Sequence, residues 1–93
     1  MSELLHIIVR GRVQGVGYRY FIRDAAQRLG ISGWVRNLPG GEVEVLARLK
    51  PASRGRFLAA LQQGPTMSQV SDLEITEPPS GTVFPDQDFN IRQ

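Results

Sequence analysis

A glycine-containing stretch near the N-terminus has the residue types best suited to bind an oxyanion: Gly11-Arg12-Val13-Gln14-Gly15-Val16-Gly17-Tyr18-Arg19. Gly15 and Gly17 let the backbone turn sharply, which brings successive N–H groups close to a bound anion. These N–H groups come just before a predicted helix, where unpaired amides and the helix dipole both favour negative charge. The planar guanidinium of Arg19 can hold two phosphate oxygens at once. The stretch therefore predicts a phosphate cradle.

The same stretch differs from three other kinds of phosphate-binding loop. Gly15-Val16-Gly17 lacks the third glycine of the dinucleotide-binding fingerprint, and no Gly-Lys-Ser or Gly-Lys-Thr follows as in a P-loop. The spacing from Val13 to Arg19 matches the phosphate loop of cysteine-dependent phosphatases, but Val13 stands where the nucleophilic cysteine is needed. Because no side chain there can attack, we expect water to be the nucleophile.

The length and apolar content of the 93-residue chain are those of one small domain, and we expect a single domain over residues 1–93. The chain has no cysteine, which excludes disulfides, thiolate metal sites and cysteine catalysis, and favours a reducing compartment. No hydrophobic run approaches the roughly 18 residues of a membrane span, and residues 1–6 lack a charged signal-peptide region. We therefore expect a soluble, cytoplasmic protein with no membrane partner.

Positive charge is concentrated in the half of the chain that contains the predicted cradle. Residues 1–56 hold ten Lys or Arg and four Asp or Glu (net +6), whereas residues 57–93 hold one and five (net −4). Such a field attracts small anions, although most of the arginines are expected to be solvated surface residues. His6 is the only histidine, and we expect a surface residue there rather than a metal ligand or a base. No metal or cofactor is predicted.

Hydrophobic periodicity predicts the elements that position the cradle. Residues 4–13 alternate between apolar and more polar side chains, with the period of two that is typical of a strand buried on one face. From Tyr18 onward the apolar residues recur at helical spacing, and Gly30 is expected to end that helix. Arg19 falls in the first helical turn, from which its head group can turn back toward the cradle.

The rest of the chain completes an alternating order of strands and helices. Five further elements are bounded by glycine or proline turn signals: strands over 31–38 and 43–49, a helix from Pro51 to Gly64, and strands over 72–76 and 89–91. Gly55 weakens the first part of the second helix. The order β-α-β-β-α-β plus a short C-terminal strand predicts an α+β, ferredoxin-like split β-α-β sandwich, with two helices on one face of an antiparallel sheet.

The predicted topology brings a second polar residue to the cradle. In a split β-α-β unit the first two strands run parallel with the third between them, so their carboxyl ends lie at the same edge. Val13 and Asn37 would then be two strand spacings, or about 9 to 10 Å, apart. Asn37 shares the parity of Val35 and should face the helices, where its amide could orient a water without titrating. The pattern leaves this interpretation and a simple role in the following turn equally open.

Two stretches, Gly11 to Arg19 and Gly33-Trp34-Val35-Arg36-Asn37, resemble the signature sequences of the acylphosphatase family, and the resemblance extends to Phe89-Asn90-Ile91-Arg92. It implies metal-independent hydrolysis of the carboxyl–phosphate bond of a small-molecule acyl phosphate to a carboxylate and inorganic phosphate. Arg19 matches the essential arginine of the family, and Asn37 matches its water-orienting asparagine. The backbone amides implied to bind the phosphate are those of Gln14, Gly15, Val16, Gly17 and Tyr18.

The chemistry that the resemblance implies agrees with the residues present. A carboxylate is already a good leaving group, so a site without His, Asp or Glu needs no general acid. Positioning and charge stabilisation would then supply the catalysis. The match is looser between Met67 and Asp88, where this chain has its own Pro78-Pro79-Ser80-Gly81 sequence. That difference leaves the acyl-group preference open.

Alternative functions stay open for the same fold. Ferredoxin-like sheets can bind single-stranded RNA through exposed aromatics, but residues 42–49 contain two acids and no aromatic, and Trp34 is expected to pack or cover surface. We therefore predict no nucleic-acid partner and a monomer. The domain could also bind a phosphate compound for a larger machine without catalysis. In the simplest case the loop only turns the chain, and Arg19 pairs with a surface carboxylate.

Overall fold

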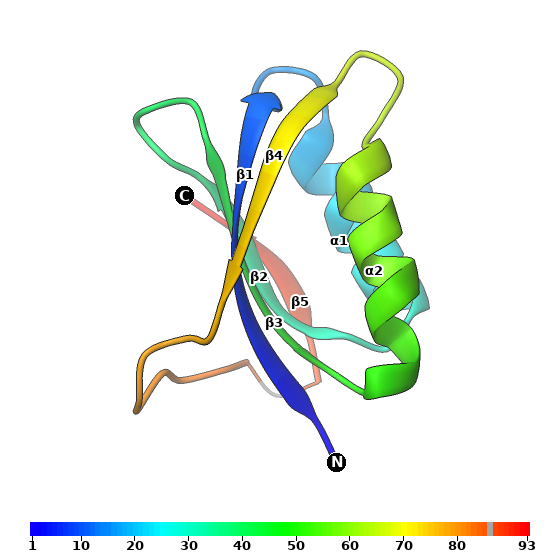
Figure 1. The fold of residues 1–93 in the computed structure, drawn as a ribbon, viewed down its shortest axis with the longest axis vertical. Coiled ribbons are helices and arrows are strands. Elements are labelled where there is room, and N and C mark those ends of the chain that lie inside the picture. Colours follow the sequence, from blue (N-terminus) through cyan, green and yellow to red (C-terminus); the bar gives the residue numbers. More distant parts are fainter. Residues whose placement is uncertain (86) are drawn as a thin grey trace.

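The computed structural model describes residues 1–85 and 87–93, which form one five-stranded sheet with two helices (Figure 1). The elements, in chain order, are β1 (Glu3–Arg12), α1 (Tyr18–Arg28), β2 (Ser32–Asn37), β3 (Val43–Leu49), α2 (Pro51–Gln63), β4 (Gln69–Thr76) and β5 (Phe89–Arg92). The predicted order of strands and helices is confirmed. The second helix begins at Pro51 despite Gly55, because proline suits the first turn of a helix, where its missing N–H costs no hydrogen bond.

The strand order is β4-β1-β3-β2-β5, so β3 lies between β1 and β2 as the split β-α-β arrangement requires. Both β1 and β2 pair with β3 in antiparallel fashion, and they therefore run parallel to each other. The carboxyl ends of β1 and β2 consequently lie at the same end of the sheet. This arrangement places the segment after Arg12 and the residue Asn37 on the same rim of the molecule.

The sheet is mixed rather than purely antiparallel, which corrects the expected strand direction at one edge. Strand β5 runs parallel to β2, with Val35 beside Ile91. The segment after β4 crosses to the far edge and enters β5 from the end of the sheet where β2 also begins (Figure 1). Strand β4 is also longer than predicted: it starts at Gln69, and a register shift between Arg10 and Gly11 lets its first residues continue the pairing.

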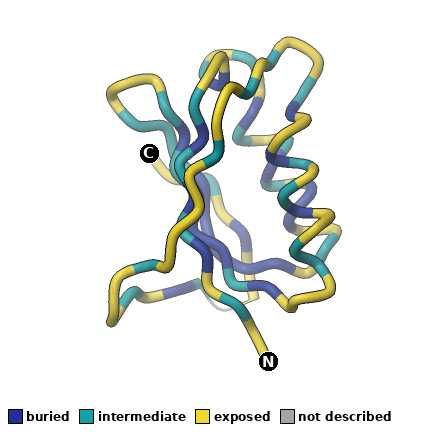
Figure 2. The backbone as a smooth tube through the Cα atoms, viewed as in Figure 1, coloured by how far each residue is buried: buried dark blue, intermediate teal, exposed yellow. Residues whose placement is uncertain are grey.

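Both helices cover one face of the sheet, and the main core lies between the two layers (Figures 1 and 2). The alternate residues of β1 that point toward the helices, Leu5, Ile7 and Val9, are buried, which confirms the predicted period of two. The fully buried Ile22 of α1 and Phe57 of α2 pack against them. Each large apolar side chain buried in this way contributes about 1.5–3 kcal/mol to folding.

The opposite face of the sheet has its own small apolar cluster. Trp34, Leu46 and Phe84 pack together there, and only 9 % of Trp34 is exposed. The guanidinium carbons of Arg36 and Arg92 lie 5.2 and 5.1 Å from the Trp34 ring, in the range of cation–π contacts. The expectation that Trp34 packs against its neighbours is therefore confirmed.

His6 lies on this same helix-free face but is more deeply placed than a simple surface residue. Its Nε2 is 2.6 Å from one carboxylate oxygen of Glu44, whose other oxygen accepts a hydrogen bond from Arg36 Nε at 2.6 Å. Burial by itself would raise the pKa of Glu44, but the hydrogen bonds from His6 and Arg36 outweigh it and lower that pKa. The network links β1, β3 and β2 on the face of the sheet opposite the main core.

The described part of the chain contains no helix long and apolar enough to cross a membrane. Its longer helix, α2, has 13 residues, against the roughly 20 that a membrane span requires.

Candidate active site

The loop between β1 and α1 has the sharply turned backbone that its glycines predict. Gly15 and Gly17 have φ values of 74° and 81°, in the left-handed region that other residues rarely adopt. Gly17 is the N-cap of α1, and the Phe21 amide makes the first helical hydrogen bond to its carbonyl. A Cβ atom added at either glycine would meet no atom within 4 Å, so the requirement for glycine here is the backbone angle and not space.

The amide groups of this loop are free to bind a ligand. Among residues 1–85 and 87–93, no hydrogen bond to a protein acceptor comes from the backbone N–H groups of Gln14 to Tyr18. Helix α1 has neither a side-chain cap nor an acidic residue in its first turn. The partial positive charge at its N-terminus is therefore not offset locally. Both features favour the binding of an anion at this end of the helix.

A cavity of about 180 Å³ opens at the start of α1. Its lining residues come from the loop, the first turn of α1 and the end of β2: Val13, Gly15, Gly17, Tyr18, Arg19, Tyr20 and Asn37. Arg19 and Asn37 are thus brought together from the first turn of α1 and the last position of β2, as the topology predicted. Gln14 and Val16 do not line the cavity; Val16 packs against the core instead.

Arg19 is partly buried and has no carboxylate partner in the described part of the chain. Its Nη1 lies 3.5 Å from the backbone carbonyl oxygen of Arg92, at the outer limit of a hydrogen bond. By contrast, Arg23 on the same helix pairs with Asp24 at 3.1 Å. The alternative in which Arg19 pairs with a surface carboxylate is therefore not what the structure shows. Its charge remains available to the cavity.

Asn37 faces the cavity on the helix side of the sheet, as its shared parity with Val35 predicted. Its Oδ1 is buried and has no hydrogen-bond partner among the residues that the structure describes. The turn after β2 is closed by backbone bonds, from Leu38 N to Glu42 O at 2.8 Å and from Gly41 N to Leu38 O at 3.2 Å. The Asn37 side chain makes no bond in that turn, so the turn role that the sequence left open finds no support.

Tyr18 anchors the start of α1 and is not placed for acid–base chemistry. Its hydroxyl donates a 2.7 Å hydrogen bond to the carbonyl of Leu61 in α2, and only 1 % of the residue is exposed. Burial raises the pKa of Tyr18 well above its ordinary value. The side chain thus fixes where the helix begins relative to α2. Sequence reasoning placed Tyr18 on the buried stripe of the helix but did not find its partner.

Gln14 has a role that sequence reasoning missed. The sequence assigned only its backbone amide, whereas its side chain donates 2.8 Å hydrogen bonds to the carbonyls of both Leu38 and Glu42. An amide side chain in a loop otherwise made of glycine and valine was the one available signal. The bonds join the loop to the β2–β3 hairpin.

The cavity provides positive charge and hydrogen-bond donors but no side chain that could act as a base near neutral pH. No His, Asp or Glu lines it in the described structure. Over residues 1–85 and 87–93 there is also no group of three or more His, Cys, Asp or Glu that could hold a metal ion. The arrangement can bind a tetrahedral oxyanion and orient a neutral water molecule beside it.

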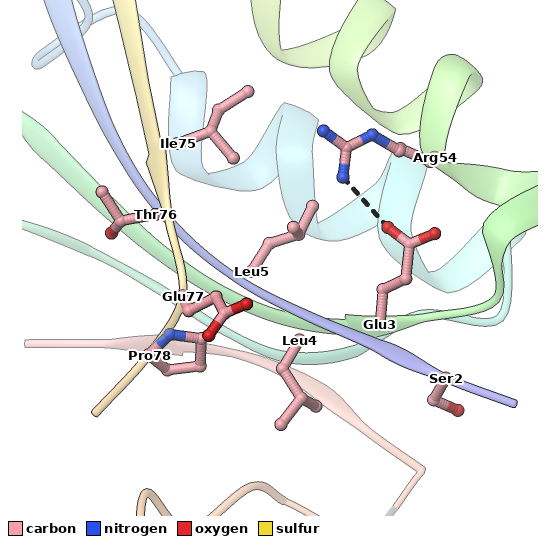
Figure 3. Close-up of a pocket in the computed structure, with 9 residues that line it drawn as sticks. All are labelled: Ser2, Glu3, Leu4, Leu5, Arg54, Ile75, Thr76, Glu77 and Pro78. Carbon is pink, nitrogen blue, oxygen red and sulfur yellow. Dashed lines mark hydrogen bonds and ion pairs between the residues drawn. The ribbon is translucent and has the colours of Figure 1, made fainter. Parts of the chain in front are cut away.

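A larger hollow of about 560 Å³ lies at the opposite end of the sheet, beside the start of β1 (Figure 3). In it Arg54 points toward Glu3, and Nη1 to Oε1 is 2.9 Å. Because the positive charge is already paired and Glu77 adds a further acid on the rim, this hollow does not suit an anion. The smaller cavity at α1 is therefore the better candidate site.

Comparison with known sequences identifies the family: the acylphosphatase family model matches residues 5–91. The chain belongs to the acylphosphatase family. The acylphosphatase of Methanothrix thermoacetophila is 46% identical over 77 residues, which is 83% of this chain and 86% of that protein. The acylphosphatase of Bacillus licheniformis is 45% identical over 85 residues, or 91% of this chain and 92% of that one.

Solved structures of the family have the same fold. The crystal structure of acylphosphatase from Bacillus subtilis superposes with a TM-score of 0.85 and 37% sequence identity, over 100% of both chains. The resemblance inferred from the two signature stretches is thereby confirmed, as is the ferredoxin-like architecture. As a family member, the chain is a hydrolase that acts on acid anhydrides.

Proposed function

We propose that this chain hydrolyses the carboxyl–phosphate bond of small-molecule acyl phosphates to a carboxylate and inorganic phosphate, with Arg19 and Asn37 as its catalytic residues. One observation carries this assignment. Among the residues that the structure describes, a guanidinium without an ion pair and a buried amide oxygen without a partner line one cavity at a helix N-terminus. The first group suits a phosphate, and the second suits the water that attacks it.

The phosphoryl group binds to the Arg19 guanidinium and to the loop amides from Gln14 to Tyr18, of which those of Gly15, Gly17 and Tyr18 belong to residues that line the cavity. These donors surround the equatorial oxygens, where charge is spread in the transition state of phosphoryl transfer. Because the folded loop holds its amides in place before the substrate arrives, these donors need little reorganisation during the reaction. The positive charge comes from the protein itself, so the proposed mechanism needs neither a metal nor a cofactor.

The attacking water is oriented by Asn37, whose Oδ1 accepts one of its hydrogens. The water oxygen forms a new bond to phosphorus while the bond from phosphorus to the carboxylate oxygen breaks, and the carboxylate leaves with the electron pair. A non-bridging phosphate oxygen of the substrate takes the proton that the water loses. This assignment of the proton follows from the absence of a base in the described lining of the cavity. A rate that required an enzyme group titrating near neutral pH would contradict it.

We also propose that the protein acts as a monomer in the cytoplasm, without a nucleic-acid partner. The described cavity is built by one chain, and the absence of cysteine favours a reducing compartment. The helix-free face offers no open aromatic platform for bases, since Trp34 is covered by Leu46, Phe84 and two arginines.

The test is hydrolysis of benzoyl phosphate by the purified protein, with and without a metal chelator, alongside Arg19→Ala and Asn37→Ala. Arg28→Ala is the matched control, because Arg28 is exposed at the far end of α1 and does not line the cavity. We expect chelator-resistant activity that survives Arg28→Ala and falls to a small residual rate in the other two variants. A folded protein that binds phosphate without hydrolysing the substrate would instead favour a binding module.

A further inference from the structure

The side chain of Gln14 joins the two halves of the candidate active site. Its Nε2 donates one hydrogen bond to Leu38 O and one to Glu42 O, each 2.8 Å long and partly buried. Both acceptors are carbonyls, which cannot donate, so the nitrogen of the amide must be the end that faces them. Both hydrogens of the amide are used, and the orientation of the side chain is unambiguous.

These two carbonyls belong to the hairpin that begins directly after Asn37. Glu42 O also accepts the backbone bond from Leu38 N, and Leu38 O also accepts the bond from Gly41 N. Gln14 therefore binds both ends of the turn, at the carbonyls just after β2 and just before β3. Asn37 and Val43 form the last pair of the β2–β3 ladder, directly before this turn. Fixing the two ends of the turn therefore also fixes the end of β2 that carries Asn37.

No other hydrogen bond in the described structure runs between the loop after β1 and this hairpin. The sheet joins the two segments only before the loop begins, because the β1–β3 ladder ends with Val9 opposite Val43, the residue that also pairs with Asn37 of β2. The phosphate-binding amides are on the first segment, and the amide oxygen of Asn37 is on the second. Their relative position is consequently set by these ladders, by the core beneath them and by the two bonds from Gln14.

We infer that Gln14 is a positioning residue, whose side chain holds Asn37 at the distance from the bound phosphate that in-line attack requires. The inference rests on the proposed function and adds a role for Gln14 that is separate from its backbone amide. Removing the side-chain bonds leaves the amide in place, so phosphate binding should survive while the attacking water loses its orientation. A misplacement of about 1 Å in a reacting group can lower a rate by about 10²-fold.

The test is a double-mutant cycle with Gln14→Met and Asn37→Ala, measured by kcat and KM for benzoyl phosphate and by inhibition with inorganic phosphate. Methionine has a similar length but no donor. We expect Gln14→Met to lower kcat by about 10- to 100-fold, with the phosphate inhibition constant within about threefold of the parent. In the Asn37→Ala background the same substitution should have no further effect on kcat, since there is no amide left to position.

The control is Gln62→Met, the same change at an exposed glutamine of α2 whose side chain lies 3.5 Å from Val70 O, away from the cavity. It should leave kcat unchanged. Equal losses from Gln14→Met in both backgrounds, or an unchanged kcat, would overturn the inference while leaving the proposed function intact. Should Gln14→Met not fold, the same cycle is run with Gln14→Asn, which keeps the donors on a side chain too short to reach both carbonyls.

A second measurement separates this inference from the proposed function. If the parent protein hydrolyses no acyl phosphate, the proposed function fails. The side-chain amide resonances of Asn37 in the phosphate-bound protein then decide whether Gln14 positions it. We expect these resonances to shift or broaden in Gln14→Met and to stay unchanged in Gln62→Met. Resonances that do not move in Gln14→Met would refute the positioning role.

Discussion

The bond from the Tyr18 hydroxyl to Leu61 O should be necessary for stability but not for chemistry. Leu61 lies in the last turn of α2, where its carbonyl would normally accept a bond from the amide four residues on. That residue is Pro65, which has no N–H. The 2.7 Å bond from Tyr18 therefore satisfies a carbonyl that the helix itself cannot pair.

Tyr18→Phe keeps the ring that fills the core and removes only this donor. A buried polar group left unpaired costs about 1–3 kcal/mol, and 1 kcal/mol corresponds to roughly 4–8 °C in Tm for a domain of this size. We therefore expect a clearly lower Tm and a lower free energy of unfolding in urea. Hydrolysis of benzoyl phosphate by the folded variant should stay within a few-fold of the parent, because the proposed site uses only the backbone of Tyr18.

The burial of the same hydroxyl predicts the behaviour of the protein in alkali. Burial raises the pKa of Tyr18 in the folded state, so the folded protein keeps the phenol proton at a pH where the unfolded chain has lost it. The stabilisation is fully present below the ordinary tyrosine pKa of about 10 and is lost as the pH rises above it. Stability should then fall with a slope approaching about 1.4 kcal/mol per pH unit for the one proton involved.

The assay is urea unfolding at a series of pH values for the parent and for Tyr18→Phe, with Tyr20→Phe as the control. Tyr20 is 56% exposed, so Tyr20→Phe removes a phenol hydroxyl at the surface and leaves the buried one in place. The alkaline loss of stability should be present in the parent and in Tyr20→Phe, and smaller in Tyr18→Phe. Equal stability of Tyr18→Phe and the parent at neutral pH, or an identical alkaline slope, would refute the reasoning.

Three further predictions concern the site and the helix-free face. Arg19→Lys should keep the charge but lose the bidentate hydrogen bonds to two phosphate oxygens, so kcat/KM in the benzoyl phosphate assay should fall less than in Arg19→Ala. A kcat/KM as low as that of Arg19→Ala would show that the charge alone contributes nothing. Gly17→Ala, at φ 81°, should cost about 1–2 kcal/mol in urea unfolding and weaken phosphate inhibition; parent-like values would show that the loop tolerates a Cβ. The contacts that lower the pKa of Glu44 stabilise the fold at any pH above the ordinary pKa of 4.5, and this stabilisation is lost as the pH falls below that value. Glu44→Gln should therefore flatten the acid limb of the unfolding profile. An unchanged limb would mean that the contacts with His6 and Arg36 add nothing.

Much of the site was predictable because it depends on local rules. The backbone freedom of Gly15 and Gly17, the place of Arg19 in the first helical turn and the parity of Asn37 all follow from the chain within a few residues. The split β-α-β topology then converted two distant stretches into neighbours, because parallel strands joined by a right-handed crossover end at the same edge. The family relationship rests on the same two stretches and is confirmed by relatives that cover most of the chain.

The tertiary structure decided what local rules do not encode. A period-two pattern at Phe89–Arg92 indicates a strand, but not that it runs parallel to β2, since the pattern is the same in either direction. Asn37 faces the cavity and does not close its turn, because backbone hydrogen bonds close the turn instead. The sequence pattern does not specify those bonds. The partners of Gln14 lie 24 and 28 residues away and that of Tyr18 lies 43 residues away, so those bonds exist only once the layers have packed. The amino-acid sequence by itself determined which groups could bind a phosphate, and packing determined which of them are held still.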